Sequence, residues 1–210
     1  MRFLLLTLVT AACGFSALAE DDYFPLHIGD ESTMAATLIS KDGKVFEGIV
    51  RRSIETSVNR DGETWFRLRM RAERLPIKMN YTTLVRKDRK AFYCIYEGLE
   101  SLKVTWKTDQ PLGGMTPNQE QVVFGLPLVK GAVFKHKAGD NTMTCSVLDL
   151  ETVTLAGETY TNCYHLRRAG ADGYQEDDWQ AANIGPVKMT TVEASGKKFT
   201  YTLKEFKPGK

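Results

Sequence analysis

Apolar and polar residues alternate along much of this chain, and this period of two is the feature that most limits its fold. The clearest stretch is residues 66–72, FRLRMRA, in which apolar side chains take the even positions and arginines the odd positions between them. Successive side chains of a β-strand point to opposite faces, so the pattern is typical of a strand with one buried and one solvent-exposed face. Helical periodicity is nearly absent elsewhere. We therefore predict an all-β fold with only minor α-helix.

Two Asp-Gly turns, at residues 41–43 and 60–62, join predicted strands in the first half of the chain. Such a pair makes either a two-residue hairpin loop or the end of a three-residue loop whose glycine is left-handed. At 60–62, a two-residue loop would place Ile54 opposite Arg69. A three-residue loop would place Ile54 opposite Leu68, which keeps one face of the hairpin apolar. We therefore predict three-residue loops at both turns.

The predicted register carries one electrostatic cost. It places Arg51 opposite Arg71, and two like charges at that position require an anion or a nearby acid. The other predicted cross-strand pairs are Thr56 with Phe66, Glu55 with Arg67, Leu38 with Phe46, and Met34 with Val50.

Strand patterns continue to the end of the chain. They cover residues 78–85, 91–97, 102–106, 132–137, 142–155, 158–167, 185–193 and 198–206. The segment 107–121 holds two prolines and two glycines and is predicted to be a long loop. It separates two runs of strands, at about 23–106 and 122–206, within one domain that spans residues 20–210. A meander of roughly ten or more strands must protect its edges, so we predict a curved antiparallel sheet or half-barrel.

The first nineteen residues have the features of a secretory signal peptide. A basic residue precedes a short apolar run, and Ala17-Leu18-Ala19 is a small-x-small cleavage site. We predict cleavage after Ala19 and export to the periplasm or the medium, with no transmembrane span in the mature chain. The alternative is a lipoprotein modified at Cys13, which follows a partial lipobox that has Thr10 in place of the usual branched aliphatic residue.

Charge and cysteine content argue against several functions. The 28 basic residues, less the one in the predicted signal peptide, nearly balance 26 acidic residues. The chain therefore has no global field that would attract nucleic acid. After cleavage Cys94, Cys145 and Cys163 remain, and none belongs to a CxxC pair, so a thioredoxin-like redox centre is unsupported. Two or three of them are interpreted as buried small hydrophobes, and whether two form a disulfide stays open.

The last third of the chain resembles a pattern found in exported bacterial β-rich proteins of unknown function. The matching positions are Val153, Ala156, Gly157, Tyr160, Cys163, Trp179, Ala181, Gly185, Val187 and Lys188, together with the FPLxxG start at residues 24–29. Here Ser32 and Thr33 stand where such proteins usually continue with a tryptophan. The resemblance implies a curved sheet similar to the outer-membrane lipoprotein-carrier fold, whose concave side often holds an apolar ligand. It implies no catalytic residues.

An enzymatic function lacks support in the motifs. The three histidines, His27, His136 and His165, form no zinc signature, and no nucleophile elbow, phosphate loop or dinucleotide fingerprint is present. The acidic run 176–178 is interpreted as a solvated turn ahead of Trp179. We therefore predict a non-enzymatic protein without a cofactor or metal, and a hydrolase built from scattered residues is the distant alternative.

Two binding functions remain, each with its own candidate residues. The first is the binding of a lipid or other apolar ligand by aromatic side chains, for which the candidates are Trp65, Tyr93, Tyr96, Trp106 and Trp179. The second is the binding of a polyanion or an envelope protein by an arginine-rich strand face, formed by Arg51, Arg67, Arg69 and Arg71. For most of these residues a structural role in the core or on a wet strand face is the simpler interpretation.

The short motifs FPLHIG and LPLVKG, at residues 24–29 and 126–131, share a Pro-Leu-x-x-Gly pattern. Nothing else repeats at their offset, which argues against a duplicated fold. Proline removes a donor and glycine permits a turn, so each motif is predicted to mark the start of a run of strands.

Overall fold

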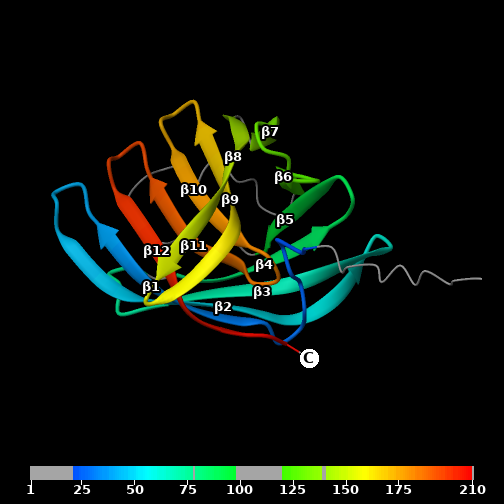
Figure 1. Ribbon diagram of the computed structural model, residues 1–210, viewed down its shortest axis with the longest axis horizontal. Helices are drawn as coiled ribbons and strands as arrows, with labels where there is room; N and C mark the ends of the chain where they lie inside the picture. The colour runs from blue at the N-terminus through cyan, green and yellow to red at the C-terminus, as the bar shows by residue number, and fades with distance from the viewer. Residues whose placement is uncertain (1–20, 78, 98–119, 139–140, 210) are drawn as a thin grey trace, which may run out of the picture.

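The computed structural model describes residues 21–77, 79–97, 120–138 and 141–209 (Figure 1). These residues form β-strands and no helix. The strands are β1 (Glu31–Ile39), β2 (Val45–Arg60), β3 (Glu63–Glu73), β4 (Asn80–Lys87), β5 (Ala91–Glu97), β6 (Gln121–Gly125), β7 (Val133–Ala138), β8 (Asn141–Leu155), β9 (Glu158–Gly170), β10 (Gln175–Ala181), β11 (Gly185–Val192) and β12 (Lys198–Lys207).

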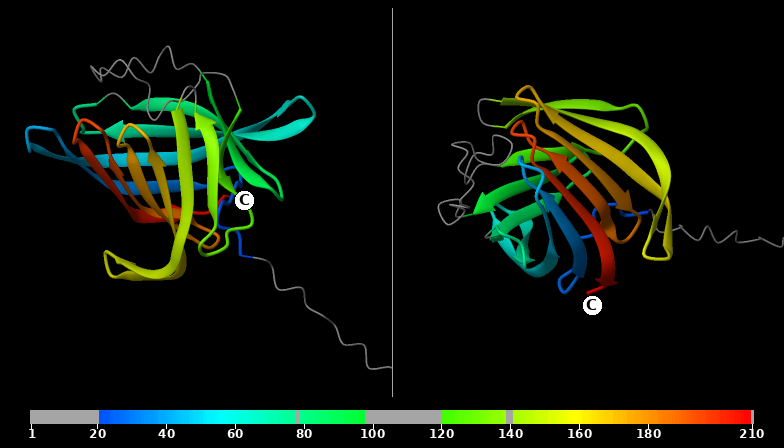
Figure 2. Two further views of the ribbon diagram at one scale, coloured as in Figure 1. Left: turned by 90° about the horizontal axis from the view of Figure 1, so that it is seen from above. Right: turned by 90° about the vertical axis from the view of Figure 1, so that its left-hand side faces the viewer.

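All twelve strands belong to one antiparallel sheet with the order β6-β5-β4-β3-β2-β1-β12-β11-β10-β9-β8-β7. Each half of the chain is a meander, and the halves join where β1 pairs with β12. The sheet curls until β6 and β7 approach each other, so that it forms a nearly closed barrel (Figures 1 and 2). The predicted all-β curved antiparallel sheet is confirmed, and it is curled further than a half-barrel.

The register between β1 and β2 is the predicted one. Met34 faces Val50 and Leu38 faces Phe46. Residues 41–43 form the expected three-residue loop, closed by a hydrogen bond from the Ser40 amide to the Lys44 carbonyl at 2.9 Å. The apolar residues at even positions of both strands therefore lie on the inner face.

The hairpin between β2 and β3 differs from the prediction near its turn. Its loop has two residues, Asp61 and Gly62, both with positive φ (54° and 83°), which suits a tight hairpin turn. Near the turn Thr56 therefore faces Arg67, and neither the predicted Thr56–Phe66 pair nor the Glu55–Arg67 pair forms. A β-bulge between Ile54 and Thr56 then shifts the register by one residue.

Beyond that bulge the pairing is the predicted one. Ile54 faces Leu68, and Arg51 faces Arg71. The sequence predicted the correct register for the longer part of the hairpin because the apolar face governs that register. It missed the bulge, which reconciles that register with a shorter loop.

Two further predictions need correction, and others concern residues outside the described part of the chain. Residues 176–178 are not a solvated turn, since they belong to β10 and Glu176, Asp177 and Asp178 are all buried. Residues 121–125 form β6, at the predicted start of the second run of strands, although the first strand specified there was 132–137. The signal peptide with Cys13, the predicted strand at 102–106 with Trp106, and most of the predicted loop at 107–121 lie outside the described residues.

The segment that contains FPLHIG links the two halves of the sheet ahead of β1. Phe24 stacks on Phe92 and Phe124, with ring centroids 4.9 and 5.6 Å apart. At Asp22 the backbone carbonyl accepts a hydrogen bond from the amide of Asn183, between β10 and β11, at 2.7 Å. Pro25 is fully buried. This segment packs into the core as well as preceding the first strand.

Side chains close the seam between β6 and β7, where the sheet order shows no backbone ladder between the two strands. The ring of Phe134 on β7 lies against Gly125 on β6, leaving no room for a Cβ at that glycine. Cys145 on β8 donates its thiol to the carbonyl of Val123 on β6 at 3.3 Å. Close packing, rather than strand pairing, holds the seam together.

Candidate anion-binding site

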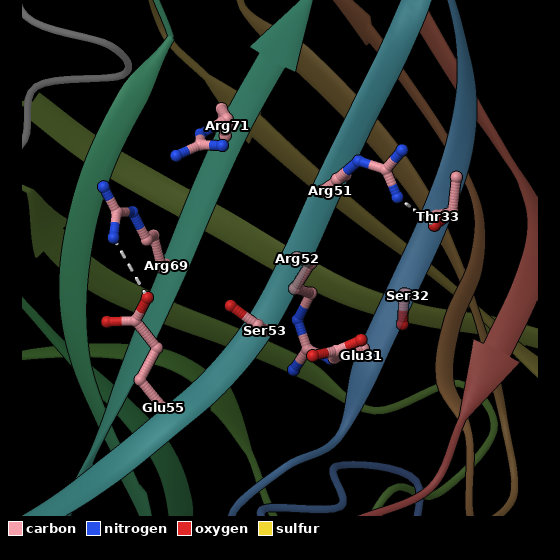
Figure 3. Close-up of a pocket in the computed structure, with 9 residues that line it drawn as sticks. All are labelled: Glu31, Ser32, Thr33, Arg51, Arg52, Ser53, Glu55, Arg69 and Arg71. Carbon is pink, nitrogen blue, oxygen red and sulfur yellow. Dashed lines mark hydrogen bonds and ion pairs between the residues drawn. The ribbon is translucent and has the colours of Figure 1, made fainter.

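A cavity of about 210 Å³ lies on the outer face of the sheet over β1, β2 and β3 (Figure 3). It lies on the face that carries the arginines of the FRLRMRA stretch, opposite to the apolar inner face. It is lined by Glu31, Ser32, Thr33, Arg51, Arg52, Ser53, Glu55, Arg69 and Arg71.

Two arginines of this cavity, Arg51 and Arg71, are cross-strand partners on β2 and β3, and their side chains point to opposite sides, that of Arg51 toward Thr33 (Figure 3). Arg51 donates from Nε to Glu73 Oε1 and from Nη1 to Thr33 Oγ1, both at 3.2 Å. Its neighbour Arg71 is exposed and forms no hydrogen bond or ion pair within the described residues. The acid expected beside the like-charge pair is therefore present for Arg51, and Arg71 remains without a counterion.

The third arginine of the cavity is anchored along its edge. Arg69 donates from Nη1 to Glu55 Oε1 at 3.2 Å, and its Nε and Nη2 both reach Asn80 Oδ1 at 3.3 Å. Arg67, one step along the same face, pairs in register with Leu84 on β4 and does not line the cavity. The structure thus gathers three of the four predicted arginines.

Arg52 lies between these arginines in sequence but has a different environment. It is 9% exposed and occupies an inner-face position of β2, between the buried Val50 and Ile54. Its nearby charges are the carboxylates of Asp30 and Asp178. The alternation of faces along β2 therefore places Arg52 on the inner face and Arg51 on the outer face.

The inner face also contains a buried ion pair that the sequence did not predict. Arg168 on β9 and Glu176 on β10 are cross-strand partners joined by a salt bridge. Glu176 also accepts a hydrogen bond from the hydroxyl of Tyr174 at 2.7 Å. From the other half of the sheet, Tyr81 and Tyr96 lie close enough to interact electrostatically with Arg168, and burial raises the pKa of both. The interior of the curled sheet is therefore polar around Arg168 and Glu176.

Asp178, two residues further along β10, is a buried carboxyl with a strongly raised pKa. Burial, followed by the neighbouring charge of Glu176, raises its pKa to about 7. Its Oδ2 accepts a hydrogen bond from Gln180 Nε2 at 2.5 Å, while its Oδ1 and the Oε1 of Gln180 are buried and have no hydrogen-bond partner in the described part of the chain.

The outer face of β8–β11 carries a second polar cluster. His165 lies between two carboxylates, with Nδ1 2.7 Å from Glu151 Oε1 and Nε2 2.9 Å from Asp177 Oδ1. Its ring stacks on Trp179 at 4.2 Å between centroids, and Trp179 donates from Nε1 to Glu151 Oε2 at 2.8 Å. Arg167 donates from Nε to Asp177 Oδ1 at 2.8 Å. Each carboxylate of this cluster is hydrogen-bonded. Because none of the residues named in the cluster is a nucleophile, the geometry of the cluster fits a structural role.

The sequence missed this cluster because it interpreted 176–178 as a turn. The usable signal was the spacing of Asp177 and Trp179, two residues apart. That spacing places both side chains on one face of a strand.

The aromatic residues predicted to bind a ligand do not converge within the described part of the chain. Trp65 and Tyr93 lie on the outer face, where the guanidinium of Arg86 stacks 5.1 Å from the first ring and 3.8 Å from the second. Tyr96 lies on the inner face, opposite Thr83 on β4. Trp179 lies on the outer face of the other half of the sheet.

The remaining expected sites concern metals, disulfides and membrane spans. Among the described residues, no group of three or more His, Cys, Asp or Glu side chains is arranged to hold a metal ion. Cys94, Cys145 and Cys163 are all buried, and none of them forms a disulfide within the described residues, a point that the sequence had left open. The described residues include no helix with the length and apolar character needed to cross a bilayer.

No protein-family model matches the sequence, and no curated protein matches it. Two solved structures share the fold at low identity. A “putative exported protein with YmcC-like fold” from Bacteroides fragilis is 13% identical, with a TM-score of 0.52 over 90% of this chain and 100% of that chain. A “putative lipoprotein” from Parabacteroides distasonis is 10% identical, with a TM-score of 0.50 over 89% of this chain and 99% of that chain.

A “putative outer membrane lipoprotein-sorting protein domain” from Vibrio parahaemolyticus aligns over 85% of each chain with 11% identity and a TM-score of 0.28. That score is too low to support a shared fold. The comparisons therefore show that the fold is the one seen in the Bacteroides and Parabacteroides proteins, and the likeness to the lipoprotein-carrier fold stays a prediction.

Proposed function

We propose that this chain is an exported, non-enzymatic binding protein that holds an anionic group, such as phosphate or sulfate, in the outer arginine cavity. The main support for an anion site is the cross-strand pair of Arg51 and Arg71, because Arg71 lacks any counterion within the described residues. Guanidinium groups recognise phosphate-like anions through planar, paired N–H donors.

Two further features support an anion at this place. The site lies on paired strands, so the backbone holds the two arginines at a set spacing without help from a ligand. Mutual repulsion of the two charges costs free energy in the unliganded protein, and an anion between them would relieve that cost.

The direct test is calorimetric titration of the purified protein with inorganic phosphate at low ionic strength, where such contacts are least screened. The double variant Arg51→Ala/Arg71→Ala should lose the binding heat. A matched control, Arg60→Ala/Arg89→Ala, removes the same charge from two exposed positions outside the cavity, the end of β2 and the turn after β4, and should bind as the parent does. Equal binding by both variants, or none by the parent, would overturn the proposal.

The same variants address the predicted polyanion. Heparin retention that is lost with Arg51 and Arg71 but kept in the control would extend the site from a single anion to a chain of them. Retention lost equally in both variants would indicate nonspecific charge attraction.

A lipid or other apolar ligand on the inner face is the second candidate function. Its supporting observation is a set of half-buried apolar side chains packed against the inner core cluster, namely Phe46, Met70, Leu75, Ile77 and Met79. Partly exposed apolar side chains of this kind are common at the openings of ligand-binding sites. Uptake of a fluorescent fatty acid by delipidated protein, weakened in Met70→Gln, would favour it, and absence of uptake would count against it.

A further inference from the structure

We propose that the ligand of the outer cavity is zwitterionic, with a phosphate ester at one end and a primary ammonium group at the other. This inference rests on the proposed anion site and names its ligand class. It follows from how the charges of the cavity are arranged along the strands, with two arginines at one level and, at the next, the carboxylate of Glu31 beside an arginine that is already paired.

The strand register places the charges in two rows. The first row crosses β1, β2 and β3 as Thr33, Arg51 and Arg71. The second row lies two residues further along each strand and consists of Glu31, Ser53 and Arg69. Same-face neighbours on a strand are about 6.6 Å apart, so the rows are separated by roughly the length of a small head group.

The two rows have opposite character. The first holds two guanidinium groups and the hydroxyl of Thr33 (Figure 3). In the second, Arg69 is already occupied by Glu55 and Asn80, whereas Glu31 is 60% exposed and, among the described residues, forms one long ion pair, with Lys207 at 4.0 Å. An anion therefore fits the first row, and a hydrogen-bond donor with positive charge fits the second.

The charge balance of the cavity supports the same ligand class. On the outer face, three arginine side chains, Arg51, Arg69 and Arg71, line the cavity together with two carboxylates, Glu31 and Glu55, which leaves one net positive charge. Arg52 also lines the cavity but occupies an inner-face position and is not counted in this sum. A highly charged polyanion would meet both carboxylates as well as the arginines. A ligand with its own internal counter-charge meets each row with the complementary sign.

Phosphoethanolamine is the simplest probe with this chemistry, and glycerol phosphate is its matched comparator without the ammonium group. In calorimetric titrations at low ionic strength, the parent protein should bind phosphoethanolamine about two- to fivefold more tightly than glycerol phosphate, as expected for one exposed ion pair. The variant Glu31→Gln should lose that preference while it keeps its affinity for inorganic phosphate. A thermal melt of each variant establishes that it is folded.

The failures of the two proposals are distinguishable. Phosphate binding without a preference for phosphoethanolamine, or a preference that survives Glu31→Gln, would overturn the zwitterion inference and leave the anion site intact. Loss of phosphate binding in the parent would overturn both.

The same head group occurs free in solution and on lipids, and sedimentation with vesicles distinguishes the sources. Retention on vesicles of phosphatidylethanolamine and phosphatidylcholine, but not on phosphatidylcholine alone, supports a lipid head group. Binding of soluble phosphoethanolamine without vesicle retention supports a free ester. Equal retention on both vesicle types would contradict recognition of the primary ammonium group.

Discussion

Arg168 of β9 lies directly opposite Glu176 of β10, and the two form an ion pair inside the nearly closed barrel. A charge buried at this depth is costly unless it is paired and hydrogen-bonded. Glu176 meets that condition with Arg168 and with the hydroxyl of Tyr174. The pair spans a hairpin that the sequence had not indicated, and it makes the interior of the sheet partly polar.

Removing one partner of this pair should destabilise the protein strongly. Glu176→Gln removes the carboxylate paired with the largely buried Arg168 guanidinium and leaves only the more distant Asp178 as a counter-charge, so we expect a loss of up to about 3–5 kcal/mol in the free energy of unfolding. Urea unfolding measures it. As a control, Glu55→Gln breaks the exposed ion pair between Glu55 and Arg69 and should lower the free energy of unfolding by less than about 1 kcal/mol. Similar losses in both variants would contradict the assigned burial.

The carboxyl of Asp178 should make stability depend on pH. Its pKa is about 7 in the folded protein, because burial and then Glu176 disfavour the charged form, and about 4 in an unfolded chain. Between these values the folded state binds more protons, so this group lowers stability as pH rises through the window.

The variant Asp178→Asn removes that dependence. Relative to the parent, its free energy of unfolding should increase from pH 5 to pH 8, as measured by urea unfolding at both values. Asp61→Asn changes a carboxyl whose side chain is 93% exposed and should leave the difference between the two pH values unchanged. An unchanged pH profile in Asp178→Asn would show that this carboxyl is ionised in the folded state.

The buried thiols should be unreactive in the native protein. Burial raises the pKa of Cys94 and Cys145 to about 11, so at pH 8 only about one thiol in a thousand is the reactive thiolate. Ellman's reagent should label neither cysteine until urea unfolds the chain. Ser195→Cys, in an exposed turn, should react at once and serves as the positive control. Rapid labelling of the native parent protein at Cys94 or Cys145 would contradict their burial.

The seam between β6 and β7 should tolerate no side chain at Gly125. A Cβ there would collide with the ring of Phe134, so Gly125→Ala should cost about 1–3 kcal/mol through overpacking. Phe134→Leu in the same chain should recover part of the loss, since a smaller side chain leaves room for the methyl group. Unfolding in urea of the single and double variants tests the coupling, and purely additive effects would argue against contact across the seam.

The alternation of residue types determined which face each side chain of β3 occupies. A strand places successive side chains on opposite faces whatever surrounds it, so Arg69 and Met70 could be assigned from their order alone. The pairing of Arg51 with Arg71 also followed from the sequence, because only one register keeps the apolar face continuous. These are local constraints, and they identified three arginines of the candidate site.

Other features depended on contacts between distant parts of the chain. The acidic run in β10 resembled a solvated turn because its carboxylates appear unpaired in sequence, and only the pairing of β9 with β10 supplies Arg168 and Arg167 as counter-charges. Likewise, the inward position of Arg52 is understandable only once Asp30 and Asp178 lie near it. Local periodicity determines where a side chain points, whereas the free energy of burying a charge depends on partners that folding brings from elsewhere.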